Sequence, residues 1–134
     1  MLATTFDTLP LYVTFLLTSV VLIAVATAIY VMITPYREIT LIRQGNAAAA
    51  VSLGGTVIGM AIALNSVARG TYAVMDLALW GGVALVCQVL VFVLVSFKLP
   101  GFRQGIEEDR LGYGITLGAF SVAMGILNAG SLST

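Results

Sequence analysis

The sequence predicts an all-α integral membrane protein built from four transmembrane helices. Of the 134 residues, 60% are hydrophobic and 9% are charged, whereas about 25% of the residues in a soluble domain are charged. Four long apolar stretches contain no charged residue at all, and each exceeds the roughly 20 residues that a helix needs to cross a hydrocarbon core of about 30 Å. The predicted spans cover residues 11–33, 46–68, 77–97 and 111–132.

The composition favours one domain and argues against several kinds of site. A single four-span domain over residues 1–134 accounts for the sequence. The net charge is zero, so we expect the lipid bilayer rather than nucleic acid as the main partner. Histidine is absent and Cys87 is the one cysteine. A disulfide within the chain is therefore excluded, and we expect no zinc site and no cofactor.

The distribution of basic residues predicts how the chain is oriented. Five of the six Lys and Arg residues lie in segments 34–45 and 98–110, and Arg69 alone lies between the second and third spans. The positive-inside rule therefore places both basic segments in the cytoplasm, and both termini in the periplasm of a bacterial inner membrane. The residues before the first span lack the positive charge of a signal peptide, so we expect this span to be retained.

An internal repeat is visible at an offset of 64 residues. The aligned segments are 52–55 with 116–119, and 59–62 with 123–126. The repeat predicts two units of two helices each, which cross the membrane in the same sense and not as an inverted pair. The predicted units are residues 11–68 and 77–132. Chance alignment of low-complexity apolar segments is the alternative.

Both cytoplasmic segments are expected to contain short amphipathic helices at the membrane surface. Pro35 suits the first turn of a helix, and Ile39 and Ile42 then recur at i and i+3 with charged residues between them. Phe102 and Ile106 recur at i and i+4 in the second segment. The apolar faces would lie against lipid headgroups. Solvated loops are the alternative.

Small residues are concentrated in the second and fourth spans. Gly55 with Gly59, and Gly114 with Gly118, have the small-xxx-small spacing that lets two helices approach closely in lipid. We therefore expect spans two and four to form the centre of the bundle or a homo-oligomer contact, while the bulkier spans one and three face lipid. The predicted packing positions are Gly54, Gly55, Gly59, Gly114, Gly118 and Gly125.

A few uncharged polar residues lie inside or at the ends of the spans. Gln88 lies near the middle of span three, where an unpaired amide in hydrocarbon costs several kcal/mol. It must bond across a helix interface or line a hydrated path. The polar residues that could serve either role are Asn46, Ser52, Thr56, Gln88, Thr116, Ser121 and Asn128.

Charged residues and histidine are absent from the predicted spans. Proton-coupled carriers usually need a carboxylate or histidine inside the membrane. Asp76 is nearest, at the outer end of span three, where Arg69, Asp76 and Trp80 are expected to anchor the chain at the interface. No nucleophile–base arrangement or phosphate-binding motif is present, so the sequence does not predict an enzyme.

Several short patterns resemble those of a known membrane-protein family. They are Gly45-Asn46-x-Ala48-Ala49-Ala50 with Leu53-Gly54-Gly55-x-x-x-Gly59, then Asp76-Leu77-x-x-Trp80-Gly81, and Gly125-Ile126-Leu127-Asn128-Ala129. Over residues 12–133 the chain resembles the family catalogued as domain of unknown function 350, the YjfL-like proteins. The resemblance implies a bacterial inner-membrane protein of paired two-span units and implies no established activity. Asp109-Arg110 departs from the Gly-Asn pair common in the family's second repeat, so a symmetric role for Asn46 is not implied.

Two functions are compatible with these features. The first is a non-enzymatic structural or accessory subunit, which forms a homo-oligomer through spans two and four and docks a membrane or cytosolic partner on segments 34–45 and 98–110. The alternative is an oligomeric channel or small-solute carrier lined by the intramembrane Ser, Thr, Gln and Asn residues.

Overall fold

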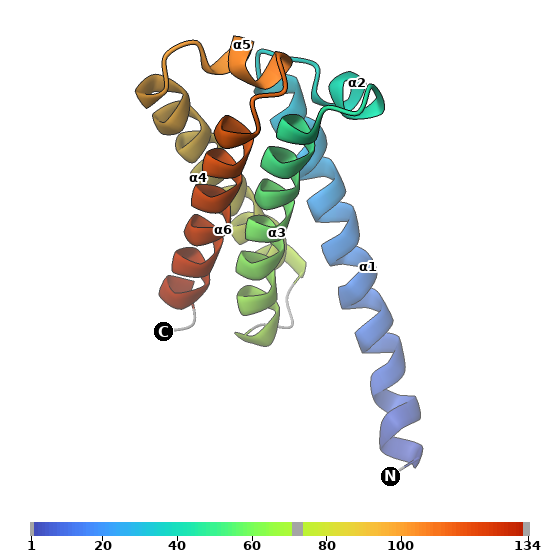
Figure 1. Ribbon diagram of the computed structural model, residues 1–134. Coiled ribbons are helices and arrows are strands. Elements are labelled where there is room, and N and C mark those ends of the chain that lie inside the picture. Colours follow the sequence, from blue (N-terminus) through green and yellow to red (C-terminus); the bar gives the residue numbers. More distant parts are fainter. Residues whose placement is uncertain (1, 71–73, 133–134) are drawn as a thin grey trace.

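A computed structural model describes the backbone of residues 2–70 and 74–132, and the side chains of residues 8–67 and 75–131. The fold is entirely helical over this part of the chain (Figure 1). The helices are α1 (Leu2–Ile33), α2 (Glu38–Arg43), α3 (Ala47–Gly70), α4 (Val74–Lys98), α5 (Phe102–Glu107) and α6 (Leu111–Leu132).

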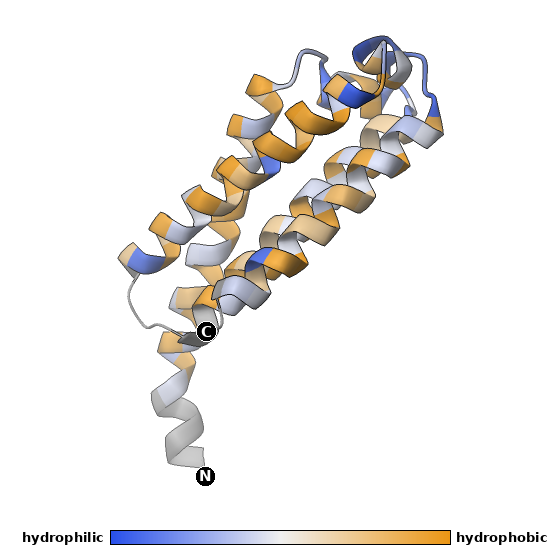
Figure 2. Cartoon of the chain, turned by 90° about the vertical axis from the view of Figure 1, so that its left-hand side faces the viewer, coloured by the Kyte–Doolittle hydropathy of each residue, from blue (hydrophilic) through white to orange (hydrophobic). Residues whose placement is uncertain are grey.

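The four predicted membrane spans are confirmed within a few residues. Four helices are long and apolar enough to cross a bilayer. Their membrane-spanning parts are Thr8–Ile33, Ala47–Val67, Met75–Lys98 and Leu111–Ser131. Apolar residues dominate these helices, and hydrophilic residues gather where the short helices lie (Figure 2).

The two short helices lie at the same end of the bundle, opposite the chain termini (Figure 1). We call this end, residues 34–46 and 99–110, the cap. α2 and α5 each have 6 residues, and their first residues are 64 positions apart. The first residues of α3 and α6 are also 64 positions apart. The backbone turns recur with the same offset: the N–H of Gly45 donates to Ile42 and that of Asp109 to Ile106, each at 3.0 Å. Gly45 and Asp109 also share a positive φ, at 86° and 59°.

The glycine-rich faces of α3 and α6 pack against each other within one chain. A Cβ atom on Gly55 would lie 2.5 Å from the carbonyl oxygen of Gly118, and one on Gly125 would lie 2.6 Å from the carbonyl carbon of Gly59. Gly114 similarly meets the backbone of Ala48. These glycines let the two backbones touch, so the expected oligomer contact at these positions is corrected: the two faces already cover each other.

Two further expectations about packing need correction. α3 is the central helix, with 56% of its span buried, but α6 is only 28% buried and α4 33%. α6 has large apolar side chains such as Phe120 and Leu127 on its outer face, so both α4 and α6 contact lipid. Gly54 does not pack against another helix, since a Cβ there would meet nothing within 4 Å.

Aromatic rings fasten the cap to the bundle. The Phe92 ring of α4 lies 6.1 Å from Tyr36, which precedes α2, and 5.8 Å from Phe102 of α5. Phe102 in turn stacks on Tyr113 of α6 at 5.9 Å, and Phe92 meets Tyr30 of α1 edge-on at 6.1 Å. Phe92 meets Tyr30 and Phe102 in the T-shaped geometry that stabilises aromatic contacts, and the Tyr36 ring is tilted against it.

The buried face of α2 differs from the predicted one. Ile39 and Ile42 are expected to share one face against lipid headgroups, but Ile39 is 48% exposed while Ile42 packs against the core, and Glu38 has an exposed fraction of 0%. Leu41 and Ile42, at i+3 and i+4 from Glu38, share its inward face and pack against the core. The charged residue therefore lies inside the protein and Ile39 lies outside.

Candidate functional site

A cluster of polar side chains runs from the cap into the middle of the bundle. Each member has an exposed fraction below 5%, although the surrounding residues are apolar. We call this set the polar cluster; its members are Tyr30, Tyr36, Glu38, Ser52, Thr56, Gln88 and Ser121. They come from α1, α2, α3, α4, α6 and the segment before α2.

Glu38 is the ionisable centre of the polar cluster. Neither of its carboxyl oxygens has a hydrogen-bond partner. Burial raises the pKa of this carboxyl from 4.5 to about 7, because desolvation disfavours the charged form. The neighbouring Tyr36 hydroxyl lowers the pKa slightly without forming a hydrogen bond of normal geometry, and no cation contributes to the shift.

Two tyrosine hydroxyls lie beside this carboxyl, both buried and both without a well-formed hydrogen bond. Tyr36 lies close to both Glu38 and Ser52, and burial together with the Glu38 charge raises its pKa. The Tyr30 hydroxyl lies close to Thr56, which is one turn further from the cap than Ser52 on α3. The hydroxyls therefore connect the cap carboxyl to the polar side chains of α3.

The polar cluster continues into the middle of the membrane. The Thr56 hydroxyl donates to the Ser52 carbonyl at 3.1 Å and lies 3.4 Å from the Ser121 hydroxyl. The Gln88 side-chain amide donates to the Ser121 carbonyl at 2.9 Å, while its Oε1 atom has no partner. Thr56 and Gln88 lie roughly 14 and 15 Å along their helices from the cap. This depth corresponds to the centre of a hydrocarbon core about 30 Å thick.

A pocket of about 290 Å³ opens on the outside of the cap. Tyr36 forms part of its wall and is the one member of the polar cluster that lines it. The other lining residues are Pro35, Arg37, Thr40, Leu41, Arg103 and Glu107. The pocket thus brings solvent next to the start of the polar cluster.

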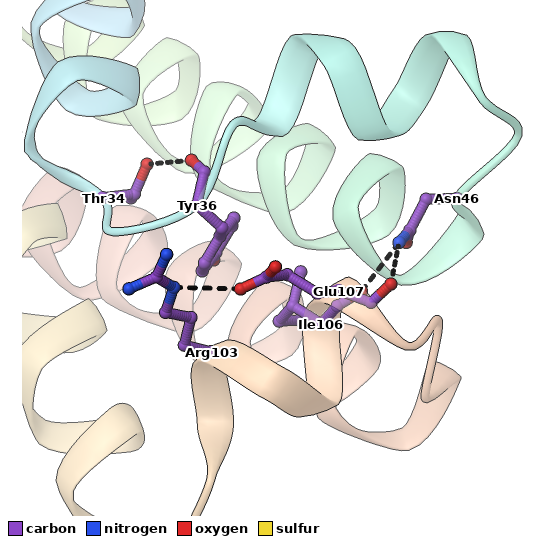
Figure 3. Close-up of polar contacts among 6 residues, drawn as sticks. All are labelled: Thr34, Tyr36, Asn46, Arg103, Ile106 and Glu107. Carbon is purple, nitrogen blue, oxygen red and sulfur yellow. Dashed lines mark hydrogen bonds and ion pairs between the residues drawn. The ribbon is translucent and has the colours of Figure 1, made fainter.

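Asn46 belongs to the cap and not to the polar cluster. Its side-chain amide donates to the carbonyl oxygens of Ile106 at 2.7 Å and Glu107 at 3.4 Å (Figure 3). Its Oδ1 accepts the N–H of Ala49, which caps the start of α3. The Asp109 carboxylate accepts the N–H of Ala48 at 2.8 Å. Each half of the chain therefore supplies one side chain to a helix terminus of the other half.

The remaining predicted site residues lie apart from the polar cluster. The Thr116 hydroxyl donates to the Gly112 carbonyl of its own helix at 2.8 Å. Asn128 lies deeper than Gln88, half-buried, with its Oδ1 3.8 Å from the Cys87 thiol and its Nδ2 unpaired. Asp76 and Trp80 are exposed at the start of α4, as expected for an interface. The side chain of Arg69 lies outside the described residues.

Comparison with known proteins assigns the family. The model of the family described as Domain of Unknown Function (DUF350) matches residues 4–132. The chain belongs to the DUF350 family. It is 33% identical over 127 residues to the UPF0719 inner membrane protein YjfL of Escherichia coli K12, covering 95% of this chain and 96% of that protein. It is 24% identical over 106 residues to the UPF0719 transmembrane protein YshE of Bacillus subtilis, covering 78% and 79% respectively.

The membrane location stated in the names of these relatives agrees with the four apolar helices of this chain. This DUF350 protein is a multi-pass inner-membrane protein. No solved structure gives a significant match to the chain. The site must therefore be interpreted from its own geometry.

Four members of the polar cluster are predictable from the sequence, and Tyr30, Tyr36 and Glu38 are not. Ser52, Thr56, Gln88 and Ser121 were identified as polar residues inside apolar spans. Glu38 was missed because α2 was aligned on Ile39 and Ile42. A face containing Glu38, Leu41 and Ile42 has equally good helical spacing.

The side chains of the polar cluster are suited to binding protons and simple cations. The cluster offers one carboxyl, several hydroxyls and an amide, all of which present oxygen atoms. Among the described residues, no group of three His, Cys, Asp or Glu side chains could hold a metal ion. A single carboxyl surrounded by neutral oxygens matches a proton or a monovalent cation in charge.

Proposed function

We propose that this DUF350 protein is a non-enzymatic carrier that moves protons or a small monovalent cation through the polar cluster. The observation that carries the proposal is Glu38, a fully buried carboxyl with no hydrogen-bond partner. A buried carboxyl whose pKa is strongly raised, close to a pocket that opens to solvent, is a candidate for a functional site.

The energetics of Glu38 favour reversible binding of a positive species. Burying an unpaired carboxylate costs several kcal/mol, and no cation among the described side chains offsets that cost. Glu38 is therefore most stable inside the fold when a proton or a cation from solution neutralises it. A pKa of about 7 means that neither protonation state dominates strongly near neutral pH.

The packing in the half of the bundle away from the cap favours a carrier over an open channel. Gln88 lies roughly 15 Å from the cap along α4 and is among the deepest members of the polar cluster, and Asn128 approaches the neighbouring Cys87, with 3.8 Å between its Oδ1 and the thiol. Apolar side chains fill much of the bundle beyond this depth. Met60, Ala63 and Leu64 of α3 are each at most 3% exposed there. Passage to the far side would require these layers to open, as in alternating access.

The orientation and the repeat form part of the same proposal. We infer that the cap lies in the cytoplasm and the termini in the periplasm, because five of the six basic residues lie in segments 34–45 and 98–110. The shared 64-residue offset of α2–α3 and α5–α6 supports an origin by duplication of a two-helix unit.

Flux through liposomes tests the proposed function. Purified protein is reconstituted with a pH-sensitive dye inside, and flux is followed under gradients of protons, Na⁺ or K⁺. We expect Glu38→Gln to lower the flux at least tenfold. Glu108→Gln, which removes an exposed cap carboxyl outside the pocket, should leave it unchanged. Liposomes as tight with the wild-type protein as without it would refute the carrier.

A structural or accessory role is the second candidate, and the exposure of α1 supports it. Only 6% of the α1 span is buried. Its exposed face includes Leu16, Leu17, Val20, Val21 and Val25, each at least 48% exposed. Because the glycine faces are covered inside the chain, a homo-oligomer would use this face of α1. Val21→Trp should then change the mass of the assembly in mild detergent, and an unchanged mass would remove this candidate's support.

A further inference from the structure

We propose that a groove between α4 and α6 binds one acyl chain of an anionic phospholipid, whose headgroup meets Lys98. This binding site is independent of the proposed carrier function. It lies on the lipid-facing side of the bundle, away from the polar cluster.

The groove is shaped and lined for hydrocarbon. Its volume is about 470 Å³. Buried Val91 and Val95 line it, together with the exposed side chains of Leu94, Phe120 and Leu127. The Thr116 hydroxyl at its edge is already satisfied by the carbonyl of Gly112, at 2.8 Å. The lining therefore offers an apolar ligand wide contact and presents no polar side chain that needs a partner.

The width of the groove distinguishes an acyl chain from a helix of a second copy. The α6 part of the lining runs from Thr116 to Leu127, roughly 17 Å at 1.5 Å per residue. A volume of about 470 Å³ over that length gives a cross-section of roughly 30 Å². A helix about 10 Å across has a cross-section of roughly 80 Å². A single hydrocarbon chain can lie within this space along its length, whereas a neighbouring helix could place only its side chains in it.

The charge at the end of the groove selects the headgroup. Lys98 lines the groove where α4 meets the cap, which is the depth of lipid headgroups. Both ion pairs found among the described residues involve other side chains, Arg103 with Glu107 and Arg110 with Glu108. Lys98 is exposed and is the chain's one lysine. Its ammonium group is therefore free to bind a phosphate at the headgroup level.

Binding of matched lipids to purified protein tests this site. Delipidated protein is titrated with phosphatidylglycerol or phosphatidylcholine carrying the same acyl chains, and bound lipid is counted by native mass spectrometry. We expect the wild-type protein to prefer phosphatidylglycerol. Lys98→Gln should weaken phosphatidylglycerol binding about fivefold, equivalent to about 1 kcal/mol per basic residue, and leave phosphatidylcholine unchanged. Ala123→Trp, which fills the groove, should abolish retention of both lipids.

Two results would overturn the proposal. Arg43→Gln removes an exposed cap charge outside the groove. If it weakens phosphatidylglycerol binding as much as Lys98→Gln, the attraction is general and not a site. If Ala123→Trp leaves lipid retention unchanged, the groove does not hold the acyl chain. If the same variant also converts a dimer to a monomer, the groove is covered by a second copy of the chain. Thermal unfolding of each variant verifies that it is folded.

Discussion

The Asn46 side-chain amide donates a 2.7 Å hydrogen bond to the carbonyl oxygen of Ile106, which starts the turn that corresponds, at the 64-residue offset, to the turn starting at Ile42. The carboxylate of Asp109 returns the connection by accepting the N–H of Ala48. The first bond adds a second donor to a carbonyl near the end of α5 that already accepts the Asp109 N–H. The second satisfies an N–H in the first turn of α3, which has no intrahelical partner.

This exchange predicts a graded series of stabilities at Asp109. Asp109→Ala loses the bond to Ala48. It also places at a positive φ a residue whose side chain cannot form the local hydrogen bonds that let Asp adopt this conformation, so we expect the free energy of unfolding to fall by about 2 kcal/mol. Asp109→Gly keeps the backbone conformation and should lose about 1 kcal/mol. Asp109→Asn keeps both the conformation and an acceptor oxygen and should be nearly neutral. Thermal unfolding in detergent ranks them, and equal losses for all three would contradict the capping role.

The α3–α6 interface predicts that two glycines in one helix respond oppositely to substitution. Gly59→Ala would bring a Cβ within 2.6 Å of the Gln88 amide nitrogen and against the Ser121 backbone, so we expect a loss of at least 2 kcal/mol. Gly54→Ala meets open space and should be neutral or stabilise α3 by up to about 1 kcal/mol.

The same pair of variants separates packing within one chain from packing between chains. The Gly59→Ala unfolding temperature should fall by the same amount at every protein concentration. A destabilisation that depends on concentration would place this contact between chains.

Much of this fold could be predicted because the bilayer imposes a simple rule. Charge-free apolar stretches gave all four spans within a few residues, and the small-residue spacing identified α3 and α6 as close neighbours. Whether those faces met inside one chain was not predictable, since the same spacing serves both kinds of contact.

The polar cluster was only half predictable, for a reason specific to short helices. In a helix of 6 residues, such as α2, two isoleucines do not determine which residues face the bundle, because a face shifted by one residue has equally good helical spacing. Shifting the face by one residue replaces Ile39 with Glu38. Only the tertiary contacts of Leu41, Ile42 and Tyr36 settle which side faces the bundle. The burial of a carboxyl also contradicts the usual preference of charged residues for solvent, and such contradictions are concentrated at functional sites.

The pKa of Glu38 predicts that the protein is less stable at high pH. Its carboxyl pKa is raised from 4.5 to about 7, so between these pH values the folded state binds more protons than the unfolded state. Stability is fully present below about pH 4.5 and falls as the pH rises, until the loss is complete above about 7, at a total on the order of a few kcal/mol. Glu38→Gln should remain stable across this range. Unfolding temperatures from pH 5 to 8 test this, and a wild-type curve parallel to that of Glu38→Gln would contradict the raised pKa.

Replacing Gln88 should separate the flux from stability. Its Nε2 atom bonds the Ser121 carbonyl at 2.9 Å, but its Oε1 atom is buried without a partner. In Gln88→Met, a side chain of similar size loses one hydrogen bond, worth about 1 kcal/mol, and removes the cost of an unsatisfied buried oxygen, about 1–3 kcal/mol. We therefore expect unchanged or slightly higher thermal stability. Proton or cation flux in liposomes should fall, because the polar cluster then ends at Thr56 and Ser121. A variant that keeps full flux would show that Gln88 only joins α4 to α6, and a strong destabilisation would show that its carbonyl oxygen has a partner after all.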